Sequence, residues 1–274
     1  MHTGKELRLR RIIDASGTSV MFAFSHGTSA PTVLPGLERP TEMVAAAAQG
    51  GATCVFAGTG LANALAPAVA EHPGLGIVAK VTATASRGEP KYQEVATASV
   101  EYALRSGFDG IVALLPFAPE NEADVIRITG RLGEECDRYG MPFIAEAEYP
   151  NAYYGEANFA EDWGVPYLKR SARLCAELGA DVVKSNWTGS AETFAEIVDA
   201  VPVPVVVAGG SKESPLDLLQ KIAEARKAGA VGCSVGRNVF QSSDPVAMIA
   251  AISAVVTRRV SPEEAHETLL VQTA

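Results

Sequence analysis

Residues 203–236 read VPVVVAGGSKESPLDLLQKIAEARKAGAVGCSVG, two short apolar runs joined by a longer amphipathic segment. The first and last runs are rich in valine and bounded by proline or glycine, which is typical of strands buried in a parallel sheet. The middle segment, residues 215–229, ends in glycine, a common signal for the end of a helix. The stretch therefore predicts a strand, a helix and a second strand.

The same alternation continues over the whole chain. Strand candidates lie at residues 19–25, 53–58, 76–81, 110–117, 141–148, 180–186, 203–209 and 230–236. Helical patterns lie between them, and those at residues 92–107 and 165–179 also end in glycine. Eight strand–helix units of about 34 residues fit a (β/α)8 TIM barrel, whose usual length is about 250 residues.

A doubly wound sheet is the alternative, but it needs a glycine-rich turn after its first strand. The segment after residues 19–25, SHGTSAPTVLPG, has no GxGxxG pattern. No linker or low-complexity tract interrupts the chain, so we expect one α/β domain over residues 1–274. Residues 4–13 predict an extra N-terminal helix across the bottom of the barrel. Ser261, Pro262 and Glu264 predict a capped helix near the C-terminus.

Composition limits the classes of function. The net charge of −9 argues against a nucleic-acid partner, because an acidic protein repels phosphate backbones. No apolar run reaches the roughly 18 residues of a membrane span, and the N-terminus lacks a signal-peptide pattern. The four cysteines form no CxxC pair, which favours reduced thiols in a cytoplasmic protein. The four histidines lack ligand-like spacing, so we expect no metal.

Lys184 ends the apolar run ADVVK, at the carboxyl end of a predicted strand. Active sites of such barrels lie at this end of the strands. Burial there should lower the pKa of the amine, and a neutral amine forms Schiff bases with carbonyl groups. The alternatives are a structural lysine paired with a loop carboxylate, or Lys80, which lies inside its strand, as the reactive amine.

Tyr149 follows the fifth predicted strand, where a phenol could transfer protons. Glu146 and Glu148 alternate with alanines along that strand, so the two sets face opposite sides. Tyr149 falls in the alanine set, and we interpret the two glutamates as structural.

Two glycine-containing segments, AGGSK and SVGRN, end the seventh and eighth predicted strands. Loops at these positions often bind phosphate, because glycines let backbone N–H groups approach an anion. Arg237 can add a bidentate contact. The predicted phosphate-binding residues are Gly209, Gly210, Ser211, Gly236 and Arg237. The alternative is that these glycines only form tight turns.

Together, ELGADVVKSNWTG, VPVVVAGGSK and VGCSVGRNVFQSSDPVAMIAAI resemble class I aldolases of the DeoC/archaeal fructose-bisphosphate aldolase type. The resemblance covers nearly the whole chain. It implies a TIM barrel, a Schiff-base lysine at Lys184, an acid/base tyrosine at Tyr149, and no metal or other cofactor. It also implies a homo-oligomer, a ring of five that can pair into a decamer.

Two departures concern the aldehyde substrate. The family commonly has DHG where this chain has Ser25, His26 and Gly27, and it has an arginine where Asn151 follows Tyr149-Pro150. Within the family, the chain most resembles enzymes of 3-amino-4-hydroxybenzoate biosynthesis, which join dihydroxyacetone phosphate to L-aspartate 4-semialdehyde. Candidates for binding the aldehyde are Ser25, His26, Ser86, Arg87, Glu148 and Asn151.

Three other functions remain open from the sequence. The first is a fructose-1,6-bisphosphate aldolase, which uses the same chemistry on a different aldehyde. The second is a thiolase-like acyl transfer, which would use a cysteine or histidine near the site. The third is a barrel that binds a sugar phosphate without turnover.

Overall fold

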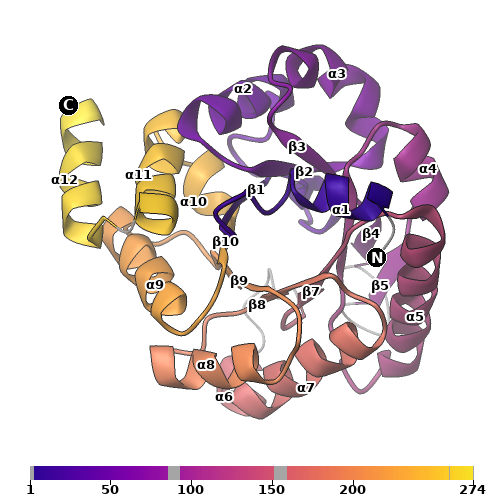
Figure 1. Cartoon of the computed structure of the whole chain (residues 1–274). Helices are drawn as coiled ribbons and strands as arrows, with labels where there is room; N and C mark the ends of the chain where they lie inside the picture. Colours follow the sequence, from indigo (N-terminus) through magenta and orange to yellow (C-terminus); the bar gives the residue numbers. More distant parts are fainter. Residues whose placement is uncertain (1–2, 86–92, 151–158, 259, 274) are drawn as a thin grey trace.

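The strands of the barrel form a closed ring with helices around it (Figure 1). The computed structural model describes residues 3–85, 93–150, 159–258 and 260–273. The eight barrel strands are parallel and follow the order β1-β10-β9-β8-β7-β6-β3-β2. Their bounds are β1 Ser19–Ala23, β2 Cys54–Gly58, β3 Gly76–Lys80, β6 Gly110–Leu114, β7 Phe143–Ala147, β8 Val182–Ser185, β9 Val205–Ala208 and β10 Gly232–Val235. Each lies inside a predicted strand, so the predicted TIM barrel is confirmed.

The helices that follow the strands pack on the outside of the ring. The longer ones are α2 Pro40–Gly50, α3 Ala62–Glu71, α5 Glu122–Tyr139, α7 Gly164–Glu177, α8 Ala191–Asp199, α9 Pro215–Lys227, α11 Pro245–Arg258 and α12 Pro262–Thr273. The shorter ones are α4 Val100–Arg105, α6 Phe159–Asp162, α10 Arg237–Phe240 and the 3-10 helices η1 His26–Thr28 and η2 Thr59–Leu61. Helix α1, Thr3–Leu9, precedes β1. Helix α12 packs against α9 and α11.

A hairpin of β4 (Thr82–Ala85) and β5 (Gln93–Ala96) corrects the prediction for residues 92–107. We expected a helix there, but Gln93–Ala96 pairs antiparallel with β4, and α4 begins only at Val100. The side chain of Ser99 caps α4 by accepting a hydrogen bond from the Tyr102 backbone N–H. Residues 93–96, with Glu94 buried, therefore form a strand and not the start of a helix.

The bottom of the barrel is closed by α1, as predicted. Lys5 of α1 forms an ion pair of 2.9 Å with Asp181, which precedes β8. Arg8 donates a hydrogen bond to the Gly140 carbonyl oxygen, just before β7. Ile12 then enters the barrel and packs against its apolar interior. Among the described residues, α1 and Ile12 therefore cover this end of the barrel, opposite the end where the strands finish.

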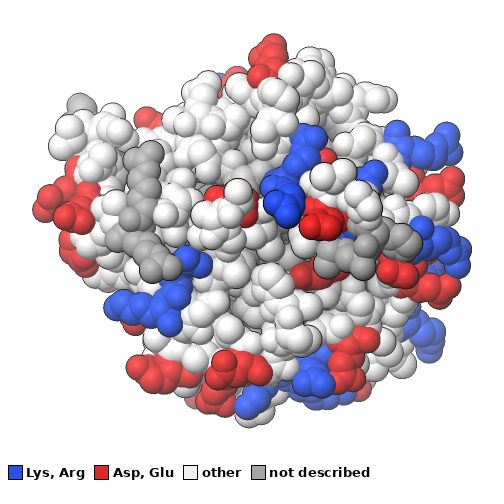
Figure 2. Space-filling model, in the orientation of Figure 1, with Lys and Arg blue, Asp and Glu red and all other residues white. Residues whose placement is uncertain are grey.

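The predicted cap of α12 is also present. Ser261 Oγ accepts a hydrogen bond from the Glu264 N–H, and Glu264 accepts one from the Ser261 N–H. In the part of the chain that the structure describes, no helix is long and apolar enough to cross a bilayer. Figure 2 shows acidic and basic side chains interspersed over one face of the molecule, without a broad basic patch on that face.

Candidate active site

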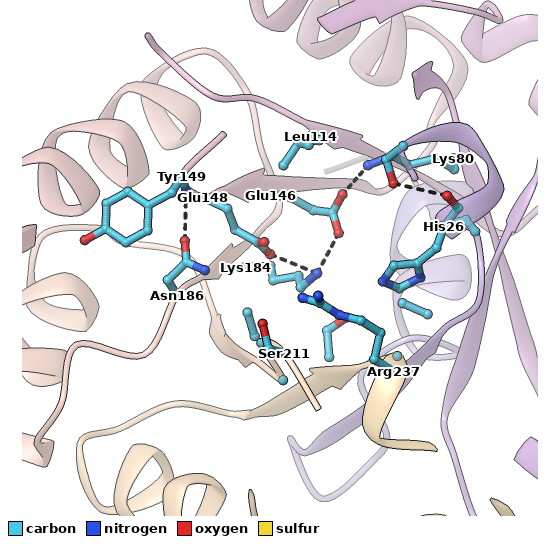
Figure 3. A pocket seen from close by; sticks show the side chains of 18 of the residues that line it. His26, Lys80, Leu114, Glu146, Glu148, Tyr149, Lys184, Asn186, Ser211 and Arg237 are labelled. Carbon is cyan, nitrogen blue, oxygen red and sulfur yellow. Dashed lines mark hydrogen bonds and ion pairs between the residues drawn. The ribbon is translucent and has the colours of Figure 1, made fainter. Parts of the chain in front are cut away.

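A cavity of about 230 Å³ opens at the carboxyl ends of the barrel strands (Figure 3). All of the site residues predicted from the sequence line it: Ser25, His26, Tyr149, Lys184, Gly209, Gly210, Ser211, Gly236 and Arg237. They come from β8 and from the segments that follow β1, β7, β9 and β10, so the barrel gathers residues that are distant in sequence. Of the aldehyde-binding candidates, Ser86, Arg87 and Asn151 lie outside the described residues.

Lys184 lies among charged side chains that point inward from β3, β7 and β8. Its Nζ is 2.7 Å from Glu146 Oε1 and 2.8 Å from Glu148 Oε1. The other oxygen of Glu146 accepts a hydrogen bond from Lys80 Nζ. Glu146 lies directly opposite Lys184 in the pairing of β7 with β8, which explains their contact. The cluster is buried, so water screens these charges little.

The position of the two glutamates corrects our interpretation of β7. The predicted alternation is present, but the glutamates face into the barrel, and Ala145 and Ala147 pack toward the helices. The barrel can hold these carboxylates because two lysines neutralise them. Lys80, predicted to be inside its strand, is its last residue and also faces inward. A carboxylate pair beside two lysines was therefore the main feature that our sequence argument missed.

The pKa of Lys184 also differs from the expectation. Burial alone would lower it, but the charges of Glu146 and Glu148 outweigh burial and raise the pKa above its ordinary value. The resting amine is therefore protonated. It becomes a nucleophile only after its proton passes to a neighbouring group, because an ammonium has no free electron pair.

Tyr149 lines the cavity, but its ring points away from Lys184 (Figure 3). Its hydroxyl donates a hydrogen bond to the Gly164 carbonyl oxygen at 3.1 Å, and its ring stacks on Tyr167 of α7. Its backbone N–H donates to Asn186 Oδ1. The structure therefore does not bring the phenol to the lysine, and its role as proton carrier stays a prediction.

The predicted phosphate loops lie across the cavity from the glutamates. Gly209 and Gly236 are sterically required. A Cβ on Gly209 would lie 2.8 Å from Val235 Cγ1, and one on Gly236 would lie 2.4 Å from His26 Cε1. Gly210 has a φ of 74°, which favours glycine.

Two polar residues missing from the sequence prediction hold these loops in place. Asn238 donates hydrogen bonds to the carbonyl oxygens of Gly209 and Ser211. Lys221 of α9 donates to the same Gly209 oxygen at 2.9 Å. Their signal was weak, because Asn238 only follows Arg237 in SVGRN and Lys221 lies in an ordinary amphipathic helix.

His26 lies beside Phe240 at the end of β1, with ring centroids 5.1 Å apart. Burial, together with the charges of Lys184 and Arg237, lowers the pKa of His26 to about 3. The imidazole is therefore neutral at physiological pH. Its Nδ1 is buried and has no hydrogen-bond partner among the described residues.

Among the described residues, no group of three His, Cys, Asp or Glu side chains is arranged to hold a metal ion. None of the four cysteines lines the cavity. All four are buried, and burial raises the pKa of each thiol above its ordinary value.

Known proteins share both the sequence pattern and the fold. A model of the DeoC/LacD family aldolases matches residues 17–242. A 2-amino-3,7-dideoxy-D-threo-hept-6-ulosonate synthase from Halobacterium salinarum is 32% identical, over 96% of this chain and 95% of the relative. A 3-hydroxy-5-phosphonooxypentane-2,4-dione thiolase from Yersinia enterocolitica is also 32% identical, over 97% of this chain and 87% of the relative.

An archaeal fructose-1,6-bisphosphate aldolase has been solved with its catalytic lysine covalently bound to the carbinolamine intermediate of the substrate. It is 25% identical and superimposes with a TM-score of 0.78, covering 93% of this chain and 99% of that one. The family match spans most of the chain, including the strand ends that line the cavity. The chain therefore belongs to the DeoC/LacD family of aldolases.

Proposed function

We propose that the protein is a class I aldolase that joins dihydroxyacetone phosphate to L-aspartate 4-semialdehyde through a Schiff base on Lys184. The product would be 2-amino-4,5-dihydroxy-6-oxo-7-(phosphonooxy)heptanoate. The observation that carries the proposal is the position of Lys184. Its amine lies in the cavity between two carboxylates, and the glycine loops with Arg237 face it from the other side.

The proposed chemistry uses the amine as a nucleophile and then as an electron sink. Lys184 attacks the ketone of dihydroxyacetone phosphate, and loss of water leaves an iminium ion. A proton then leaves the adjacent carbon, and the resulting enamine adds to the aldehyde. Water finally releases the product and restores the lysine. The phosphate loops hold the ketone beside the amine, and such positioning can lower the barrier by several kcal/mol.

The relatives support this chemistry. The carbinolamine described for the archaeal aldolase is the intermediate that precedes a Schiff base. The product named for the Halobacterium relative is a seven-carbon acid with an amino group at carbon 2 and a ketone at carbon 6. The product proposed here has the same skeleton and the same two groups, and adds a phosphate ester at carbon 7.

Two other functions have specific support. A fructose-1,6-bisphosphate aldolase would use the same lysine and matches the archaeal structure. An acyl transfer matches the Yersinia relative, but the cysteines that could carry the acyl group lie outside the cavity. His26 is then the remaining nucleophile for that reaction. The Schiff-base mechanism therefore gives a role to more of the residues that line the cavity than the acyl transfer does.

The test is borohydride reduction in the presence of dihydroxyacetone phosphate. We expect irreversible loss of activity and the mass of the reduced ligand on the peptide that contains Lys184. A label on Lys80 or Lys212, or no label, would contradict the proposal. Product analysis with L-aspartate 4-semialdehyde and with glyceraldehyde 3-phosphate would then identify the aldehyde. Size-exclusion chromatography would test the proposed ring of five or ten subunits.

A further inference from the structure

The two carboxylates that contact Lys184 have different environments. Glu146 contacts two lysines, Lys80 and Lys184, through different oxygens. The ion pair of Glu148 within the described residues is with Lys184 alone. Both side chains are in the cavity wall, about 10% exposed or little more. A carboxylate held by two cations binds a proton less readily than one held by a single cation.

The acidities of the two groups follow from these contacts. Burial raises the pKa of Glu146, but Lys184 and Lys80 outweigh burial and hold it well below its ordinary value. Burial also raises the pKa of Glu148, where the opposing charge of Lys184 is insufficient and the charge of Glu146 raises it further. Glu148 is therefore the better proton acceptor of the pair, and Glu146 stays ionised.

We propose that Glu148 is the catalytic acid/base that carries protons from Lys184 Nζ to the ketone oxygen of the substrate, and that Glu146 is a positioning residue that holds the lysine. The inference rests on the proposed Schiff-base chemistry. It assigns the step to a group 2.8 Å from the reacting nitrogen. That distance is within reach for direct proton transfer.

The steps balance without any further reactant. The carboxylate of Glu148 takes one proton from the ammonium of Lys184, and the nitrogen lone pair attacks the ketone carbon. The carbonyl electron pair moves to oxygen, which takes the proton from Glu148 and becomes a hydroxyl. The carboxylate then takes a second proton from nitrogen and gives it to that hydroxyl. The C–O bond breaks, water leaves, and the iminium ion forms with Glu148 ionised as at the start.

The position of Tyr149 favours Glu148 for this step. The hydroxyl of Tyr149 donates to Gly164 outside the barrel, and its ring stacks on both Phe159 and Tyr167. It would have to leave this stack to reach the lysine, whereas Glu148 already contacts it. Burial also raises the pKa of Tyr149, which makes it a weaker acid than an ordinary phenol.

The test follows exchange of the ketone oxygen of dihydroxyacetone phosphate with ¹⁸O-labelled water, since formation and hydrolysis of the iminium replace that oxygen. Glu148→Gln keeps the size and removes the base. We expect the exchange rate to fall by about 10²–10⁴-fold, the usual contribution of a general acid/base. Binding of dihydroxyacetone phosphate should change little, because the phosphate loops are elsewhere. Glu94→Gln is the matched control, because Glu94 is buried near Lys80 but does not line the cavity.

A second variant provides a readout that a structural role would not change. Glu148→Ala leaves space beside Lys184, and added formate should restore exchange in proportion to its concentration. If Glu148→Gln does not fold, the exchange rate of Glu148→Ala with and without formate tests the same inference. Exchange by Glu148→Gln within about threefold of wild type would overturn the inference, as would a large loss in Tyr149→Phe alone. Failure of the wild type to label Lys184 would instead reject the proposed function.

Discussion

Glu94 is a buried acid whose charge should make stability depend on pH. It lies on β5, is 2% exposed, and accepts a hydrogen bond from Thr84 Oγ1 at 2.8 Å. Its other oxygen has no hydrogen-bond partner among the described residues. Burial raises the pKa of Glu94 from 4.5 to about 6, against the opposing charge of Lys80.

The sign of the effect follows from this shift. Well below pH 4.5 the carboxyl is protonated in the folded and the unfolded states, so it adds no pH dependence. As the pH rises, the unfolded state loses the proton first. The free energy of unfolding then falls, because the folded state must either keep the proton on Glu94 or bury its negative charge. The pKa of Glu94 is about 6 in the folded state and 4.5 in the unfolded state. This difference lowers the free energy of unfolding by about 2 kcal/mol once the pH exceeds both values.

The variant Glu94→Gln isolates this contribution, because glutamine keeps the size and can still accept from Thr84. We expect its free energy of unfolding to exceed that of the wild type by about 2 kcal/mol at pH 8 and to match it near pH 4. Urea unfolding followed by circular dichroism at pH 4, 6 and 8 measures the difference. Glu134→Gln, on the exposed face of α5, is a control that should show little change at any pH. An equal difference at pH 4 and pH 8 would refute the reasoning.

Other predictions concern the cavity. Arg237→Ala should raise the KM for dihydroxyacetone phosphate about 10–100-fold, the value of a hydrogen bond to a charged group, and steady-state kinetics should show a smaller effect on unphosphorylated dihydroxyacetone. Gly209→Ala should destabilise the fold by about 1–3 kcal/mol in urea unfolding, because its Cβ would contact Val235. The kcat/KM for L-aspartate 4-semialdehyde should exceed that for glyceraldehyde 3-phosphate by about tenfold, or about 1.4 kcal/mol. Activity assays with added chelator should show no loss, since the proposed mechanism uses no metal.

The barrel was predictable because buried parallel strands leave a strong pattern. Apolar runs, most of them rich in valine and isoleucine and bounded by glycine or proline, identified all eight strands. The rule that barrel sites lie at strand ends predicted that Lys184 and Arg237 share one cavity, and both line it. The hairpin was not predictable in this way. The segment Gln93–Ala96 is only four residues long, has no apolar–polar alternation, and ends three residues before the Ser99 cap of α4, so the sequence did not distinguish it from the helix.

The charges of the site could not be predicted for a different reason. Alternation along β7 separates Glu146 and Glu148 from Tyr149, but it does not say which set faces the interior. A buried carboxylate is unfavourable unless a cation neutralises it, and that cation comes from β3 and β8, far away in sequence. The raised pKa of Lys184 has the same origin. The inward orientation of the two glutamates and the raised pKa of Lys184 both depend on contacts between neighbouring strands, which only the fold shows.

The side chains inside the barrel form two layers, an apolar layer that stabilises the fold and a charged layer that contains the site. Toward the bottom, the inward side chains are apolar and pack on Ile12, including Phe56, Val112 and Ile144. Toward the mouth, the inward-facing residues are Lys80 of β3, Glu146 of β7 and Lys184 of β8. The charged layer lies directly above the apolar one, so it is excluded from water on one side and open to substrate on the other. That position keeps the ion pairs strong and lets a ligand reach the amine. It also means that a neutral, equally sized substitution such as Glu148→Gln removes chemistry without opening a cavity in the core.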